Sequence, residues 1–322
     1  MRALICGISG QDGALLARFL LDKGYEVIGT SRDAQISSLR NLKRVKVAVN
    51  EVTLSSMAPN DFRSVLQTIK RFAPTEIYNL SGQSSVGLSF DQPVETQESI
   101  ATATHNFLEA LRFLDSSTKF YNAGSSECFG DTPPEGANES TPFRPRSPYG
   151  VAKSTAYWQV ANYREAYGVR VCTGILFNHE SPLRPARFVT RKIVSTACRI
   201  RAGSDERLRL GNLSVLRDWG YAPDFVRAMW QMLNIDGPME DFVIATGKSH
   251  PLEEFVALTF AQLGLDWRDH TDVDESLYRP TDIAFSLGDP SKAHRVLGWI
   301  AETKFEELIS SLVKSEREAA GI

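Results

Sequence analysis

The 322-residue chain lacks several features that would each assign it to a particular class of protein. No uninterrupted apolar run approaches the roughly 18–20 residues that a membrane-spanning helix needs, so we expect no membrane contact. The net charge of −3 does not suit a general nucleic-acid binder, and no nucleic-acid partner is expected. Repeats and low-complexity segments are not evident. With 42% hydrophobic and 23% charged residues, the chain has the composition of an ordinary globular protein with one large or two smaller domains.

Cysteine is also scarce, with four residues at positions 6, 128, 172 and 198. Their spacing is not that of a zinc site or a disulfide framework, so neither a metal ion nor disulfides are expected. The first residues, Met-Arg-Ala-Leu-Ile-Cys-Gly, lack the long apolar region and the cleavage site of a signal peptide. We therefore expect a cytoplasmic protein with reduced thiols.

The first half of the chain alternates short apolar runs, typical of buried strands, with segments of helical spacing. The predicted strands are Ala3–Ile8, Glu26–Thr30, Val45–Val49, Glu76–Leu80, Lys119–Ala123, Val171–Leu176 and Phe242–Ala245. The predicted helices are Ala14–Leu21, Asn60–Phe72, Glu98–Leu114, Tyr149–Tyr167, Phe188–Ala202, Asp224–Leu233, Leu252–Leu263, Ser291–Leu297 and Phe305–Lys314, and residues 31–44 are predicted to form a polar loop. Repeated strand–helix–strand order with right-handed crossovers gives an α/β fold with a doubly wound parallel sheet of the Rossmann type.

Beyond Phe177 the character of the chain changes, and its pieces indicate a smaller, discontinuous α/β domain. We predict a dinucleotide-binding Rossmann domain from residues 1–177 plus about 218–246. The remaining residues, about 178–217 plus 247–322, are predicted to form a C-terminal substrate domain.

A glycine loop lies between the first predicted strand and the first predicted helix. Its sequence is Gly7-Ile8-Ser9-Gly10-Gln11-Asp12-Gly13. Glycine permits a sharp turn and lets backbone N–H groups approach a pyrophosphate at a helix N-terminus. Three glycines alone are a weak signal, but their place between strand and helix indicates a dinucleotide site.

The residues that follow the second strand bear on the choice of dinucleotide. Arg32 suits the 2′-phosphate of NADP, because a guanidinium pairs with phosphate in a bidentate manner. Asp33 points the other way, since an acid at this place binds the ribose hydroxyls of NAD or neutralises the arginine. The sequence favours NADP and leaves NAD open.

Tyr149 and Lys153 form a Tyr-x-x-x-Lys pair on one face of a predicted helix. Tyrosine has an ordinary pKa near 10, so it is a poor base unless neighbouring positive charge favours the phenolate. With the ammonium beside it, the phenolate can remove a hydroxyl proton while hydride leaves the same carbon. The pair alone also occurs on ordinary surface helices.

Ser125, Glu127 and Cys128 follow the fifth predicted strand, at the carboxyl edge where doubly wound sheets bind ligands. The serine hydroxyl can hydrogen-bond a reacting hydroxyl, and the glutamate adds a second acid/base group that an elimination would need. A capping role for Glu127 is the alternative. Cys128 is predicted to be a bystander.

Together these motifs resemble the extended short-chain dehydrogenase/reductase family and, more narrowly, its GDP-mannose 4,6-dehydratases. The resemblance covers nearly the whole chain. Its most specific segments are residues 8–13, 78–84, 144–149, 174–182 with 188–192, 210–213 with 217–220, and 287–290. Among them, Phe-Asn-His-Glu-Ser-Pro is far more specific than the glycine loop.

The resemblance implies a lyase that converts GDP-mannose to a 4-keto-6-deoxy sugar and water by internal hydride transfer through NADP. In that family pattern, Tyr149 removes the 4-hydroxyl proton, and Glu127 removes the C5 proton and helps expel the 6-hydroxyl. Ser125 stands where the family usually has threonine, so the hydroxyl is kept. A homodimer built from the helices Glu98–Leu114 and Tyr149–Tyr167, or a homotetramer, is also implied.

Binding roles follow from the resemblance position by position. The implied cofactor contacts beyond the glycine loop and Arg32 are Leu80, Ser81, Gly82, Gln83, Ser84, Tyr149, Lys153, His179 and Arg184. The implied GDP-sugar contacts are Ser85, Asn178, Val189, Lys192, Arg217 and Arg279. A cluster of basic residues either faces the diphosphate or forms a solvated helix face, and Lys192 is the member that we favour as a substrate contact. The cluster comprises Arg187, Arg191, Lys192, Arg199 and Arg201.

Three departures from the family pattern gather around the adenosine half of the cofactor site. Asp33 replaces a second arginine, Ala58-Pro59 stands where an Asp-Leu pair is expected, and Glu95 replaces a tyrosine. A GDP-manno-heptose dehydratase, or an epimerase or 4-keto-sugar reductase of the same family, therefore remains an alternative. A non-catalytic dinucleotide sensor is the hypothesis from another class, and the presence of both Tyr149 and Lys153 speaks against it.

Overall fold

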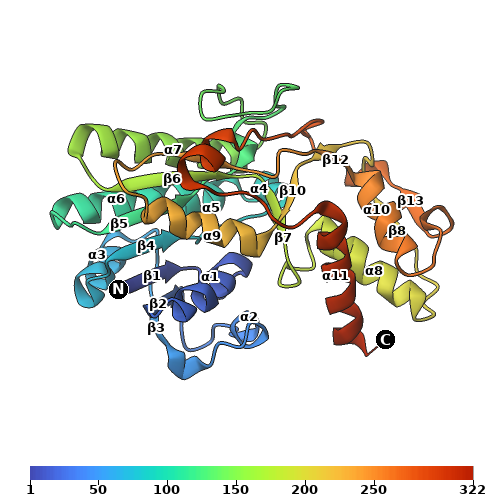
Figure 1. Ribbon diagram of the computed structural model, residues 1–322, viewed down its shortest axis with the longest axis horizontal. Coiled ribbons are helices and arrows are strands. Elements are labelled where there is room, and N and C mark those ends of the chain that lie inside the picture. The colour runs from blue at the N-terminus through green and yellow to red at the C-terminus, as the bar shows by residue number, and fades with distance from the viewer. Residues whose placement is uncertain (322) are drawn as a thin grey trace.

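The computed structural model describes residues 1–321 (Figure 1). The helices are α1 (Gln11–Asp22), α2 (Arg40–Arg44), α3 (Phe62–Phe72), α4 (Val86–Asp91), α5 (Pro93–Gln97), α6 (Ala103–Phe113), α7 (Pro148–Tyr167), α8 (Val189–Arg201), α9 (Ala222–Leu233), α10 (Leu252–Ala261) and α11 (Phe305–Ala320). The strands are β1 (Arg2–Cys6), β2 (Glu26–Ser31), β3 (Val52–Ser56), β4 (Glu76–Asn79), β5 (Lys119–Ala123), β6 (Val171–Leu176), β7 (Asn178–Glu180), β8 (Leu208–Leu210), β9 (Leu216–Arg217), β10 (Trp219–Tyr221), β11 (Phe242–Ile244), β12 (His250–Pro251) and β13 (Thr271–Val273). No helix within residues 1–321 is long and apolar enough to cross a membrane.

A parallel seven-stranded sheet forms the larger part of the molecule, in the order β11-β6-β5-β4-β1-β2-β3. Helices α1 and α9 pack together on one face, and α3, α6 and α7 cover the other (Figure 1). The strand order reverses between β1 and β4, which is where doubly wound sheets open a crevice for ligands. The predicted α/β fold with a doubly wound parallel sheet is confirmed.

A second hydrophobic core lies beside the sheet and is built from α8, α10, α11 and β8 (Figure 1). Ile193, Phe255 and Leu308 are fully buried in it. Although 247–322 was predicted to lie in this smaller unit, Ala293 and Trp299 pack into the core beneath the sheet, where the Trp299 indole donates to the Asp224 carbonyl at 2.8 Å. The predicted domain boundaries stay a prediction.

The third predicted strand is wrong. Residues 45–49 follow the short helix α2, and Lys46 has a φ of +58°, a left-handed conformation that a strand does not contain. The strand is instead β3, which pairs with β2 through Val27 and Val52. Helix α2 lies within residues 31–44, which were predicted as a loop, and α11 extends six residues beyond its predicted end at Lys314.

Candidate active site

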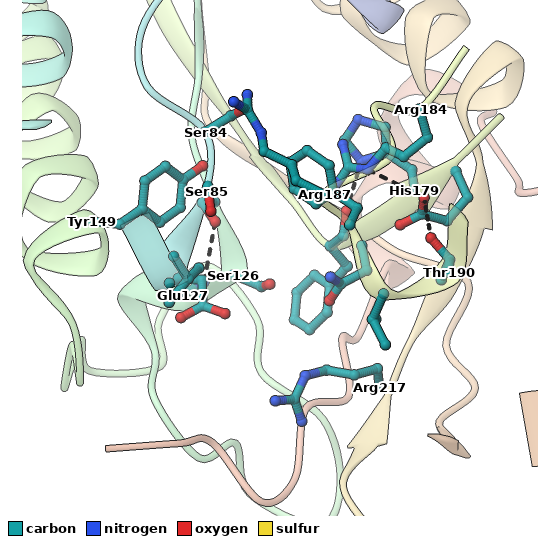
Figure 2. A pocket seen from close by; sticks show the side chains of 18 of the residues that line it. Ser84, Ser85, Ser126, Glu127, Tyr149, His179, Arg184, Arg187, Thr190 and Arg217 are labelled. Atoms are coloured by element: carbon teal, nitrogen blue, oxygen red, sulfur yellow. Dashed lines mark hydrogen bonds and ion pairs between the residues drawn. The ribbon is translucent and has the colours of Figure 1, made fainter. Parts of the chain in front are cut away.

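A cavity of about 420 Å³ opens at the carboxyl edge of the sheet, between the sheet and the second core. Figure 2 shows Tyr149, Ser85 and Glu127 on one side of it and Arg184, His179 and Thr190 on the other. The residues come from the ends of β4, β5 and β6, the start of α7 and α8, and segments around residues 210–217 and 277–282. Segments far apart in sequence therefore meet at one site.

Tyr149 lies in the first turn of α7, and local sequence explains why the helix begins there. The Ser147 hydroxyl accepts a hydrogen bond from the Gly150 N–H at 3.0 Å, and Pro148 occupies the first helical position. A Cβ on Gly150 would lie 2.7 Å from the Glu127 carbonyl oxygen, so only glycine lets α7 approach the Glu127 turn this closely. The start of α7, which carries Tyr149, is thus held against the backbone of Glu127.

The Lys153 ammonium lies one turn further along α7, 5.7 Å from the centre of the Tyr149 ring. Its Nζ donates to the Ala123 carbonyl at 2.6 Å. Burial lowers the pKa of Lys153 to about 8. Burial also raises the pKa of Tyr149 above its ordinary value, and a hydrogen bond from Ser125 opposes that rise. The structure therefore brings the predicted pair, Tyr149 and Lys153, into one cavity with the hydroxyl of Ser125.

Ser125 and Glu127 follow β5 as a short 3₁₀ turn. The Ser125 hydroxyl accepts from the Glu127 backbone N–H at 3.3 Å, so the serine also fixes the turn. Burial raises the pKa of the Glu127 carboxyl, while the guanidinium groups of Arg279 and Arg217 act in the opposite direction. A carboxyl with a raised pKa is a stronger base than an ordinary glutamate, which suits a group that must first take up a proton and then release it.

Cys128 lies behind this turn and is not among the residues that line the cavity. Burial raises the pKa of its thiol to about 11, so it is neither exposed nor ionised at neutral pH.

The glycine loop lies at the end of β1 and opens α1. No side chain caps the α1 N-terminus at Gly10, which leaves its first N–H groups to face a ligand. A Cβ on Gly13 would lie 2.3 Å from the Gly7 carbonyl oxygen, so the close packing of loop and helix requires glycine. These features fit the pyrophosphate of a dinucleotide.

Two side chains of this loop are hydrogen-bonded inside the protein. Gln11 donates to the His179 carbonyl at 3.2 Å and accepts from the Ser181 hydroxyl at 2.8 Å. The His179 ring binds Asp12 at 2.9 Å and the Phe177 carbonyl at 2.8 Å, and stacks on Phe225.

Asp12 and His179 form a buried pair. Burial alone would raise the pKa of Asp12 and lower that of His179, but their mutual attraction outweighs it in both, so the pKa of Asp12 is lowered and that of His179 raised. The pair joins the glycine loop to β7. The implied contacts of Gln11, Asp12 and His179 with a cofactor stay a prediction.

Two arginines that line the cavity share one carboxylate. Arg217 and Arg279 approach Asp282 at 3.1 and 3.5 Å, and Arg217 is 8% exposed. Lys192 also lines the cavity, where its Nζ donates to the Arg209 carbonyl at 2.6 Å and burial lowers its pKa. The three cations suit a diphosphate.

The predicted basic group is not one surface. Arg187 and Lys192 line the cavity, whereas Arg191 pairs with Glu316 and Arg199 pairs with Glu206 at 2.7 Å.

Most of the predicted site residues line this cavity. They are Asp12, Leu80, Ser81, Gly82, Gln83, Ser84, Ser85, Ser125, Glu127, Tyr149, Lys153, Asn178, His179, Arg184, Val189, Lys192, Arg217 and Arg279. Six predicted residues lie outside its lining: Gly7, Ser9, Gly10, Gln11, Gly13 and Arg32. Five of these form the adjoining glycine loop, and Arg32 follows β2, further along the same edge.

Sequence reasoning missed several lining residues, among them Glu180, Phe188, Thr190 and Asp282. The Glu180 carboxylate accepts from the Thr190 hydroxyl at 2.8 Å and lies 3.2 Å from Arg184 Nε. Glu180, Phe188 and Thr190 stand within the segments that resemble the family most specifically, and that placement is the signal that could have found them. Asp282 has no local signal. Residues 1–321 contain no group of His, Cys, Asp or Glu placed to bind a metal ion.

Comparison with known proteins agrees with this geometry. The family model for GDP-mannose 4,6-dehydratase matches residues 4–312. GDP-mannose 4,6 dehydratase 1 of Arabidopsis thaliana is 44% identical, over 99% of this chain and 90% of that protein. The GDP-mannose 4,6-dehydratase of Yersinia enterocolitica is 40% identical, over 99% of this chain and 94% of that protein.

Solved structures agree on the fold. UDP-glucose 4-epimerase of Thermus thermophilus, in complex with NAD, superimposes with a TM-score of 0.85 at 25% identity, covering 99% of this chain and 100% of that one. dTDP-glucose 4,6-dehydratase of Bacillus anthracis, also in complex with NAD, gives a TM-score of 0.86 at 18% identity, covering 100% and 98%. The family match and the sequence identities show that this chain belongs to the GDP-mannose 4,6-dehydratase family.

Proposed function

We propose that the protein is a GDP-mannose 4,6-dehydratase, which converts GDP-D-mannose to GDP-4-keto-6-deoxy-D-mannose and water. The observation that carries the proposal is that Glu127, Tyr149 and Lys153 line the same cavity as Arg217 and Arg279. The Tyr-Lys pair supports redox chemistry. The buried glutamate supplies the additional acid/base group that elimination needs.

A nicotinamide dinucleotide is the cofactor of this proposal, and NADP is favoured over NAD. The uncapped α1 N-terminus and the close packing at Gly13 support dinucleotide binding. When bound, the nicotinamide supplies a hydride acceptor for C4 of the sugar and a hydride donor for C6. Arg32, after β2, is the residue proposed to meet the 2′-phosphate.

In the proposed reaction, Tyr149 takes the proton of the 4-hydroxyl, and the Lys153 ammonium beside it favours the phenolate. The Ser125 hydroxyl hydrogen-bonds the same sugar oxygen. The ketone at C4 makes the C5 proton acidic, and Glu127 removes it. The electron pair at C5 forms the C5–C6 double bond as the 6-hydroxyl leaves, and Glu127 delivers its proton to that hydroxyl, so one water is lost. The 4-keto-6-deoxy product is completed by one proton at C5, which balances the proton that Tyr149 removed from the 4-hydroxyl.

The remaining predicted residues are proposed to hold the GDP-sugar. Arg217, Arg279 and Lys192 bind the diphosphate, for which a guanidinium pair is well suited. Ser85, Asn178 and Val189, which also line the cavity, are proposed to contact the sugar and the nucleoside.

The test is incubation of the purified protein with NADP⁺ and either GDP-mannose or GDP-manno-heptose, followed by mass spectrometry. Loss of one water from GDP-mannose is the expected result. Loss of water from the heptose alone would reassign the substrate. Recovery of both sugars with an unchanged mass, while dinucleotide binding is intact, would overturn the dehydratase assignment.

We also propose a homodimer through the outer faces of α6 and α7. These faces expose large apolar side chains: Phe113 is 69% exposed, Trp158 62% and Tyr167 55%. Such residues are unusual on a free surface when they gather on adjacent helices. Analytical ultracentrifugation of the wild type and of Trp158→Glu tests this, and a wild-type monomer would refute it.

A further inference from the structure

We propose that Glu95 sets the preference between NADP and NAD, by pairing with Arg32 and so reducing the free energy gained from the 2′-phosphate. The inference rests on the proposed function, since it assumes that a nicotinamide dinucleotide binds across the glycine loop. It assigns a role in cofactor selectivity to α5, a helix that does not line the catalytic cavity.

The residues after β2 are the first evidence. Asp33, the residue that would favour NAD, uses Oδ1 to cap its own turn, accepting from the Gln35 N–H at 2.9 Å and the Ile36 N–H at 3.4 Å. The Ala34 N–H is bound to the Ser56 hydroxyl at 3.0 Å, which ties the same turn to β3. One oxygen of the Asp33 carboxylate is therefore engaged by the turn, whereas Arg32 carries the positive charge at this edge that a 2′-phosphate would bind.

The position of Glu95 is the second piece of evidence for its role in cofactor selectivity. Its Oε1 lies 3.9 Å from Arg32 Nη1, and it is the one carboxylate within ion-pair distance of that guanidinium among residues 1–321. The Arg32 side chain is 85% exposed and that of Glu95 49%, so the pair can open. A 2′-phosphate would have to take Arg32 away from Glu95 or share it.

The size of the effect follows from the exposure of the pair. Exposed ion pairs contribute about 0.2–1 kcal/mol, which corresponds to a factor of about 1.4 to 5 in affinity. Removing the Glu95 charge should therefore tighten binding of NADP⁺ by about 1.4-fold to fivefold. It should leave binding of NAD⁺, which lacks the 2′-phosphate, unchanged.

The experiment is calorimetric titration of the full chain with NADP⁺ and with NAD⁺, without sugar, in the wild type, Glu95→Gln, Arg32→Ala and the double variant. Glu98→Gln is the matched control, because it removes the same charge three residues further along from an exposed position that has no ion pair within the described residues. Glu95→Gln should raise the ratio of the NAD⁺ Kd to the NADP⁺ Kd, and Arg32→Ala should lower it. In the Arg32→Ala background, Glu95→Gln should have no further effect.

Because the ion pair is exposed, raising the salt from about 0.01 M to about 1 M should remove most of the gain. An unchanged ratio of the NAD⁺ Kd to the NADP⁺ Kd in Glu95→Gln, or an equal rise in Glu98→Gln, would overturn the inference about Glu95 and leave the proposed function untouched. Failure of the wild type to bind either dinucleotide would overturn the proposed function as well.

Discussion

Replacing Glu127 with glutamine removes the acid/base group of the proposed elimination while keeping the size and the hydrogen-bonding shape of the side chain. General acid–base groups contribute about 100-fold to 10,000-fold to a rate, or about 3–5 kcal/mol of the barrier. The kcat for loss of water from GDP-mannose should fall by that factor. Glu127 does not form an ion pair with Arg217, but its charge is felt by Arg217 and Arg279, so its neutralisation should strengthen rather than weaken the binding of GDP.

The assay follows water loss by mass spectrometry and incorporation of solvent deuterium at C5 by NMR. Both should fall together in Glu127→Gln, because one carboxylate serves both steps. Dinucleotide affinity measured by calorimetry should be retained. Glu135→Gln is the control, since Glu135 is exposed on the segment that follows and does not line the cavity. Deuterium incorporation at the wild-type rate in Glu127→Gln would refute the role of Glu127 as the C5 base.

Two further predictions concern the cofactor site and the pH profile. Gly13→Ala places a Cβ 2.3 Å from the Gly7 carbonyl oxygen, so dinucleotide affinity should fall at least tenfold and stability by about 1–3 kcal/mol; an unchanged Kd by calorimetry would contradict the packing argument. Burial lowers the pKa of Lys153 to about 8, so its ammonium is present below that pH and lost above it, and kcat/KM should fall as the pH rises through about 8. Lys153→Arg keeps its charge at higher pH and should move that fall upward; an identical profile in both proteins would exclude Lys153 as its cause.

The residues proposed to be catalytic can be found from sequence because their arrangement is local. Tyr149 and Lys153 are one helical turn apart, and Ser125 and Glu127 immediately follow a strand, so spacing alone brings each pair together. The third strand was misplaced because the apolar run at 45–49 resembles a strand, whereas the left-handed Lys46 makes it a turn after α2.

Asp282 could not be found in the same way. It lies 65 residues from Arg217, in a segment without a motif, and only the fold brings its carboxylate to the two cavity arginines. Gln11, Asp12 and His179 are predicted from sequence as cofactor contacts, but a sequence does not reveal the hydrogen bonds that link them inside the protein. A motif identifies which residues gather at a site. It does not show whether each one faces the ligand or supports a neighbour that does.

The charges around Glu127 link substrate binding to its protonation. Burial raises the pKa of this carboxyl, and Arg279 and Arg217 counteract the rise. A diphosphate bound to these two arginines would offset their positive charge, so the pKa of Glu127 should be higher in the substrate complex than in the free protein. The acid limb of kcat should therefore lie at higher pH than the acid limb of kcat/KM. The bound sugar also shields this carboxyl from water, which raises its pKa in the same direction, so coincident limbs would contradict the proposed binding of the diphosphate at the two arginines.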